Sequence, residues 1–176
     1  MNIYLVTDTH FNHERLKTMG AGRPDNYEER LWKSLERISA EDTLIHLGDI
    51  CIGKDQEVHD RLSGLPFKKI LVKGNHDNKS DNWYYEHGWD FVCQETVIKF
   101  NKKLILLKHI PIGAEHRGEL DLHLHGHLHG TGDESHRFGD TFVEGGKHDP
   151  TWHYDVAPDR HEYQAIILKS IIEKMV

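Results

Sequence analysis

Apolar runs and helical stretches alternate along the first half of the chain. Runs of β-branched and apolar residues predict strands at residues 2–7, 43–47 and 69–72. Between them, residues 27–39 place apolar side chains at helical spacing, and residues 55–62 predict a shorter helix. This strand–helix–strand–helix–strand order predicts right-handed crossovers and a mainly parallel sheet.

The second half is richer in strands. Residues 95–100 and 103–108 flank Asn101 and Lys102, an arrangement that predicts a β-hairpin. The segment 131–150 is polar, Gly-rich and long for a compact domain, which is typical of either a functional or a mobile loop. Further strands are predicted at residues 121–124, 152–156 and 163–168, and a last helix at 169–176. Since no repeat or linker is visible, we expect one domain over residues 1–176.

Composition narrows the classes of protein that fit. The net charge of −7, counted with neutral histidines, argues against an extended nucleic-acid-binding surface. The two cysteines, Cys51 and Cys93, form no C-x-x-C pair, so we expect free thiols in a reducing compartment. The start resembles no signal peptide, and no apolar run approaches the ~20 residues of a membrane span. We therefore expect a cytoplasmic protein with no membrane contact.

Side chains that can bind metals follow the predicted strands. The stretch Lys-Gly-Asn-His-Asp at residues 73–77 lies where the strand at 69–72 ends, at the edge where open α/β sheets bind ligands. On its own such a turn is more often a capping or surface loop. Asp8 and His10 stand two residues apart on an extended backbone, so both side chains can reach one point. In all, five strand ends carry such groups: Asp8 and His10, Asp49, Asn75 and His76, His109, and His127 and His129.

These residue types limit which ion could bind. Carboxylate, imidazole and amide oxygen together suit Mn, Fe, Zn or Ni better than Ca or Mg. With only two cysteines, an all-thiolate zinc site is excluded. Histidine, with 16 copies, is the commonest protein ligand for such metals.

The order of these motifs resembles that of the calcineurin-like metallophosphoesterases. The five blocks are Asp8-x-His10, Gly48-Asp49, Gly74-Asn75-His76-Asp77, His109 and Gly126-His127-x-His129, and they span residues 8–129. The chain is most similar to small bacterial and phage-type members that open with D-T-H-F-x-H and carry an Arg-Pro loop, here Arg23-Pro24.

The resemblance implies a fold and a metal centre. The fold would be a four-layer α/β/β/α sandwich. Two divalent transition-metal ions, Mn before Fe, Zn or Ni, would share a hydroxide that attacks phosphorus in line with the leaving group. Asp49 would bridge the two ions. The resemblance places Asp8, His10, Asp49 and His129 on one ion and Asp49, Asn75, His109 and His127 on the other.

Further roles follow from the same resemblance and from position. His76 would donate the proton to the leaving alkoxide, and Asp77 would either orient His76 or cap its own turn. Asn75, His13 and Arg23 could contact substrate, although His13 could instead support a metal ligand and Arg23 could be a solvated loop residue. The other histidines considered, His123, His125, His46, His59 and His87, are expected outside the metal shell.

The sequence therefore predicts a metal-dependent phosphoesterase. Because the chain is short and has no evident cap domain, we favour phosphodiesters of small or nucleotide-type substrates over phosphomonoesters. A non-catalytic binding or scaffold protein of the same fold is the alternative from another class. A nuclease acting on long DNA would need a basic surface that this chain lacks. The oligomeric state stays open.

Overall fold

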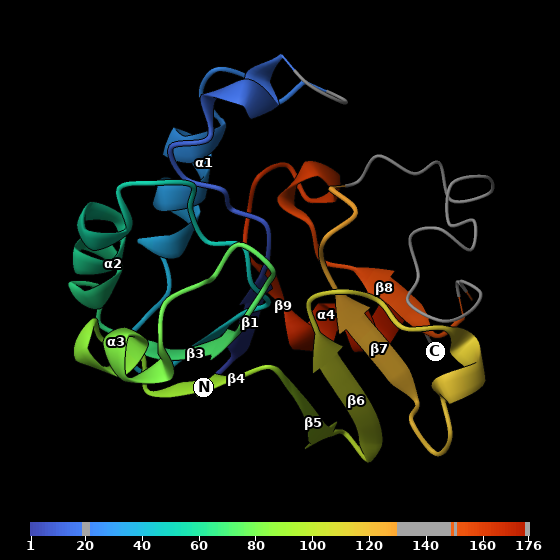
Figure 1. Cartoon of the computed structure of the whole chain (residues 1–176). Helices are drawn as coiled ribbons and strands as arrows, with labels where there is room; N and C mark the ends of the chain where they lie inside the picture. The colour runs from blue at the N-terminus through green and yellow to red at the C-terminus, as the bar shows by residue number, and fades with distance from the viewer. Residues whose placement is uncertain (19–21, 130–148, 150, 175–176) are drawn as a thin grey trace.

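The computed structural model describes residues 1–18, 22–129, 149 and 151–174, and its elements form two facing sheets (Figure 1). The first sheet has the order β4-β3-β2-β1-β9. Its four parallel strands are β1 (Ile3–Val6), β2 (Thr43–His46), β3 (Lys68–Val72) and β4 (Phe91–Cys93). β9 (Ile166–Ile167) closes one edge antiparallel to β1. The predicted parallel sheet is thus confirmed.

The second sheet has the order β5-β6-β7-β8. β5 (Glu95–Phe100) and β6 (Lys103–Lys108) form the predicted hairpin, and both turn residues, Asn101 and Lys102, have the positive φ that a two-residue hairpin turn requires. β7 (Leu122–His125) and β8 (His153–Asp155) then add in parallel. The chain enters this sheet directly from β4, so the two sheets are joined through Gln94.

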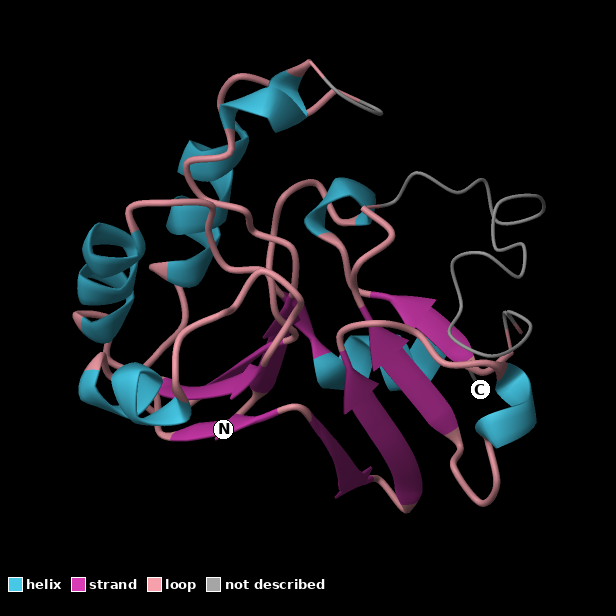
Figure 2. Ribbon diagram, in the orientation of Figure 1, coloured by secondary structure: helices cyan, strands magenta, loops and turns pink. Residues whose placement is uncertain are grey.

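Helices cover the outer face of the first sheet (Figure 2). They are α1 (Tyr27–Leu35), α2 (Asp55–Ser63) and α3 (Asp81–Glu86). Their buried side chains share one apolar cluster with strand residues such as Val6, Leu44 and Leu71. Three short 3-10 segments, η1 (Glu14–Lys17), η2 (Ala114–His116) and η3 (Pro158–Arg160), lie in the loops.

A second apolar cluster fills the space between the sheets. It combines alternate residues of the facing strands, among them Leu5, Ile45 and Leu124, and so follows the two-residue period of strands. α4 (Leu168–Lys174) also joins this cluster. The mixed α/β class with two parallel-rich sheets and helices is therefore as predicted.

The observed elements differ from the predicted ones in a few places. α1 ends at Leu35 instead of residue 39; the apolar stripe continues to the buried Ile38, but residues 36–39 already turn toward β2. α3 and β4 were not predicted, although Ser80 gives a signal, since its hydroxyl caps α3 by accepting the N–H of Trp83. β9 is shorter than the predicted strand at 163–168. The predicted loop at 131–150 lies outside the described residues except for residue 149. The last two residues of the predicted final helix, 175 and 176, also lie outside them.

Candidate metal centre

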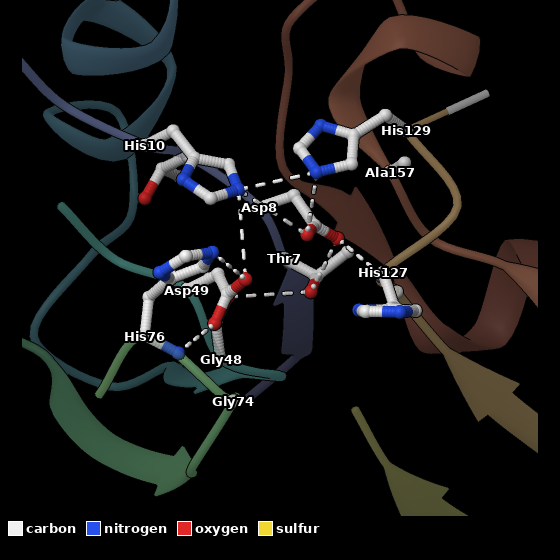
Figure 3. A network of polar contacts seen from close by, with 12 residues as sticks. Thr7, Asp8, His10, Gly48, Asp49, Gly74, His76, His127, His129 and Ala157 are labelled. Carbon is white, nitrogen blue, oxygen red and sulfur yellow. Dashed lines mark hydrogen bonds and ion pairs between the residues drawn. The ribbon is translucent and has the colours of Figure 1, made fainter. Parts of the chain in front are cut away.

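The motifs meet at the carboxyl ends of the strands, on the edge where the two sheets open (Figure 3). Asp8 lies two residues after β1 and Asp49 three residues after β2, and both have left-handed backbones, with φ of 47° and 58°. The turns touch closely here. A side chain at Gly74 would collide with Asp49, so only glycine fits between the β3 tip and the β2 tip.

Three side chains form the first group, Asp8, His10 and His129, whose ligand atoms lie within 4.8 Å of one another. The two imidazole Nε2 atoms are 3.2 Å apart, and they lie 3.6 Å and 3.5 Å from Asp8 Oδ1. The rings of His10 and His129 are stacked, with 4.7 Å between their centroids. One carboxylate oxygen and two imidazole nitrogens thus face a common point.

The second group consists of Asp49, His109 and His127, again with ligand atoms within 4.8 Å. Asn75 adds an amide oxygen, because its Oδ1 lies 3.2 Å from His109 Nε2 and 3.1 Å from His127 Nδ1. The opposite ring nitrogen of His109, Nδ1, donates to the carbonyl of Leu47 at 2.7 Å. This bond leaves Nε2 of His109 as the nitrogen available to a metal.

Asp49 lies between the two groups. Its Oδ2 is 3.6 Å from His10 Nε2 (Figure 3) and 3.3 Å from His109 Nε2, so one oxygen faces a ligand from each group. The other oxygen, Oδ1, accepts the backbone N–H of His76 at 2.9 Å. The position is the one that a carboxylate shared by two ions would need.

Charges in the centre compensate one another. Burial alone would raise the pKa of Asp8, but the charges of His109, His129 and His10 hold it well below its usual value. Burial would lower the pKa of His109, yet Asp8 and Asp49 raise it to about 9. The carboxylates are therefore ionised, and a bound cation would displace the proton from His109.

The residues present fit divalent metals. Asp8 Oδ2 accepts hydrogen bonds from the Thr7 hydroxyl and the His127 N–H, whereas Oδ1 is buried without a hydrogen-bond partner in the described part of the chain. A buried carboxylate oxygen left open toward two imidazoles is costly unless a cation occupies that point. The unpaired oxygen therefore indicates a cation, and the mixed oxygen and nitrogen donors favour a transition-metal ion.

His76 and Asp77 point in different directions. The His76 side chain is half exposed, and its Nε2 lies 3.9 Å from Asp49 Oδ2. The carboxylate of Asp77 is buried and makes no hydrogen bond to His76 among the described residues. It accepts backbone N–H groups of Asp49, Ile50 and Gly74 instead. The carboxylate therefore caps its own turn through Gly74 and ties that turn to the Asp49 turn.

Two of the three residues predicted to contact substrate, His13 and Arg23, lie near the first group, whereas Asn75 lies in the second. The ring of His13 is 5.4 Å from that of His10, its Nδ1 is buried without a partner in the described residues, and burial lowers its pKa. Arg23 is buried at 4% exposure, and its guanidinium is held by Asp159 and by the carbonyl of Thr9. Its side chain is therefore already engaged inside the protein.

Two residues that support the centre were missed from the sequence, Thr9 and His46. The Gly48 N–H donates to Nδ1 of His46, which leaves the proton on Nε2 to donate to the Thr9 hydroxyl at 2.9 Å. Thr9 in turn donates to the carbonyl of Ile50 at 2.8 Å. Burial lowers the pKa of His46 to about 3, so the ring stays neutral. The chain ties the Asp8–His10 turn to the Asp49 turn.

A cavity of about 280 Å³ opens beside the second group. Its wall includes Asn75 and His109 together with Lys73, Gln94, Glu95 and Lys108. Lys108 pairs with Glu95 at 3.1 Å across the β5–β6 hairpin. The cavity therefore offers charged and amide groups next to two candidate ligands.

The fold and this centre are those of a metallophosphoesterase, and comparison with known proteins agrees. The calcineurin-like phosphoesterase superfamily domain matches residues 1–157. The chain therefore belongs to this superfamily, which is metal-dependent.

Individual relatives are distant. A protein of unknown function from Aquifex aeolicus has a similar structure, with a TM-score of 0.74 and 26% identity over 99% of both chains. An uncharacterized protein of Methanocaldococcus jannaschii is 26% identical over 134 residues, which are 72% of this chain and 69% of that one. An archaeal phosphodiesterase matches at a TM-score of 0.48 and 18% identity, over 72% of this chain and 73% of that one, too remote to assign a substrate. In the described residues no helix is long and apolar enough to cross a bilayer.

Proposed function

We propose that this protein is a dinuclear metal-dependent phosphodiesterase that acts on small, nucleotide-type substrates, with Mn²⁺ as its preferred ion. The observation that carries the proposal is the position of Asp49, whose Oδ2 faces His10 of one ligand group and His109 of the other. A shared carboxylate between two ligand groups is the arrangement of two-metal phosphoryl-transfer sites.

The candidate ligands fall into two groups, which we assign to two ions. Asp8, His10, Asp49 and His129 would hold one ion, and Asp49, Asn75, His109 and His127 the other. When bound, two divalent ions would supply an activated water and neutralise charge on the phosphate oxygens.

The remaining chemistry belongs to side chains around the ligands. His76 would donate a proton to the leaving alkoxide, because its imidazole is half exposed and lies 3.9 Å from Asp49 Oδ2, while its backbone N–H donates to Asp49 Oδ1. His13 would contact the substrate phosphate, because its side chain is partly exposed and its ring centroid lies 5.4 Å from that of His10.

The cavity supports a diester substrate. A diester carries a second organic group besides the leaving group. The cavity beside Asn75 and His109 would hold this second group. The leaving group would lie at His76, whose ring is 5.5 Å from that of His10. The two ester groups would then occupy separate places. The ammonium of Lys108 and the amide of Gln94 could hydrogen-bond the oxygens of a ribose or a second phosphate.

Hydrolysis of chromogenic esters tests this proposal. Protein stripped of metal and reloaded with Mn²⁺ should hydrolyse bis(p-nitrophenyl) phosphate with a higher kcat/KM than p-nitrophenyl phosphate. Lys108→Met should raise the KM for a nucleoside p-nitrophenyl diester several-fold and leave the small diester unaffected. Lys103→Met is the matched control, since Lys103 lies on the same strand but does not line the cavity. Its ammonium pairs instead with Asp121 at 3.3 Å. A higher kcat/KM for the monoester would contradict the proposed preference for diesters. Inactivity on both esters would contradict the proposal that the protein is a phosphoesterase.

A further inference from the structure

The guanidinium of Arg23 is clamped by a carboxylate from near the other end of the chain. Its Nε and Nη2 donate to Oδ1 and Oδ2 of Asp159 at 2.9 Å and 2.7 Å, a two-bond fork that arginine forms with carboxylates. Both side chains are almost fully buried, at 3% and 11% exposure. The pair therefore fixes the loop before α1 against η3.

The same guanidinium touches both sides of the first ligand group. Nη1 donates to the carbonyl of Thr9, the residue between Asp8 and His10, at 3.3 Å. Nη2 lies 3.3 Å from Nδ1 of His129, on the side of the ring away from the metal-facing Nε2. Arg23 thus connects the Asp8–His10 turn to the His129 ring behind the first site.

Neighbouring aromatic rings hold the arginine in this place. Its guanidinium carbon is 5.1 Å from the ring centre of Tyr27 and 6.0 Å from that of Tyr163. The hydroxyl of Tyr27 donates to the carbonyl of His10 at 2.9 Å, which adds a second tie to the same turn. All three guanidinium nitrogens of Arg23 already contact protein groups, so clamping a phosphate would require breaking the pair with Asp159.

We propose that Arg23 and Asp159 are a pair of positioning residues that hold His129 and the Asp8–His10 turn in the geometry of the first metal site. The inference rests on the proposed metal centre and replaces the predicted role of Arg23 as a phosphate clamp. Asp159 lies beyond residues 1–157, which match the superfamily domain, so the pair brings in a residue from outside the matched region.

The two sites should respond differently to loss of the pair. Arg23 contacts the turn and the ring of the first group, whereas the second group is held by Asn75, Leu47 and the Asp49 turn. Residues that orient metal ligands typically contribute ~10–100-fold to metal affinity. Removing the pair should therefore weaken one Mn²⁺ site by ~10–100-fold and leave the other unchanged.

Calorimetric titration of metal-free protein with Mn²⁺ tests this asymmetry. Arg23→Met keeps the stem between the tyrosines and removes every donor, and Asp159→Asn keeps the size and removes the charge. Arg160→Met is the matched control, because Arg160 belongs to the same η3 segment and pairs with Asp155 at 3.1 Å. Both test variants should weaken one of two binding events, and the control should keep both.

Kinetics and NMR separate the possible outcomes. At saturating Mn²⁺ the Arg23→Met variant should recover the wild-type KM, because mass action refills the weakened site. A raised KM with both ions bound would restore the phosphate clamp and overturn the positioning role. In metal-free protein the His129 ring nitrogen resonances should shift in Asp159→Asn but not in Arg160→Met. If wild type bound fewer than two ions, the proposed function would fail, yet this shift would still decide whether the pair holds His129. Unchanged resonances would overturn it.

Discussion

The carboxylate of Asp77 accepts the backbone N–H of Asp49 at 2.7 Å. The same oxygen accepts the N–H of Gly74 at 2.8 Å, and the second oxygen accepts the N–H of Ile50 at 3.2 Å. One buried side chain thus joins the tip that follows β2 to the tip that follows β3. The candidate bridging ligand and Asn75 depend on this junction for their relative position.

Replacing Asp77 should therefore disturb the metals and leave proton transfer from His76 to the leaving group intact. In Asp77→Asn the amide nitrogen would oppose a backbone N–H, so the Asp49 turn should shift. We expect Mn²⁺ affinity to fall by ~10–100-fold and, at limiting Mn²⁺, kcat/KM to fall by the same factor for good and poor leaving groups. Asp90→Asn is the control, because Asp90 also accepts a backbone N–H, that of Lys69 at 2.7 Å, away from the centre. A loss confined to poor leaving groups would instead show that Asp77 acts through His76.

His76→Ala should show the opposite pattern. A general acid typically contributes ~10²–10⁴-fold to rate, and mainly where the leaving group needs a proton. The variant should keep both metal ions, lose that factor with an alkyl ester and lose much less with a nitrophenyl ester. Steady-state kcat/KM for the two esters, with metal content measured alongside, checks this, and His116→Ala serves as an exposed-histidine control. Equal losses on both esters would remove His76 from the proton-donor role.

Metal removal should lower the thermal stability. Asp8, Asp49 and four imidazoles converge at the centre, and an ion that binds only the folded state stabilises it by mass action. At an ion concentration 100 times Kd the gain is about 2.7 kcal/mol, or roughly 5–10 °C for a chain of this size. Chelation followed by calorimetry should show this fall, and Mn²⁺ should reverse it. The melting temperature of Asp49→Asn should respond far less; an equal response would mean that the ions bind elsewhere.

A buried histidine away from the metals gives a pH prediction. The ring nitrogens of His123 are buried without hydrogen-bond partners in the described residues, and burial lowers its pKa from 6.5 to about 2. The unfolded chain therefore takes up a proton below pH 6.5 that the folded chain excludes, so stability is present above pH 6.5 and is lost as the pH falls. Below pH 6.5 this histidine should lower the free energy of unfolding of the wild type by about 1.4 kcal/mol for each pH unit. His123→Leu should remove that pH-dependent loss. Urea unfolding of both proteins at pH 7.0 and 5.5 measures it, and a pH-independent difference would contradict it.

The strand-end motifs made most of the site predictable. A strand that ends in Gly-Asp or Gly-Asn-His-Asp delivers its side chains to the edge shared by neighbouring parallel strands, so Asp49 and Asn75 converge without knowledge of the loops. The partners of Arg23 and Asp77 could not be predicted in this way. Arg23 meets Asp159 across 136 positions, and Asp77 turns toward the backbone of Asp49 instead of its neighbour His76. Both choices depend on tertiary packing, which local sequence does not encode.

The short elements were also beyond local pattern. β4 has three residues and β9 two, too few for a period to be visible, and each forms because a neighbouring strand offers an open edge. The hairpin at Asn101 and Lys102, by contrast, was predictable because Asn101 tolerates positive φ and the two flanking strands are six residues long.

Titration of metal-free protein with Mn²⁺, with hydrolysis of bis(p-nitrophenyl) phosphate followed in the same samples, tests the central claim most directly. The position of Asp49 between the two ligand groups predicts two ions per chain, with full activity only when the second ion binds. Spin coupling between the two ions in the electron paramagnetic resonance spectrum should appear at the same point. Saturation at one ion per chain, or two uncoupled ions without hydrolysis, would contradict a shared two-metal phosphodiesterase centre.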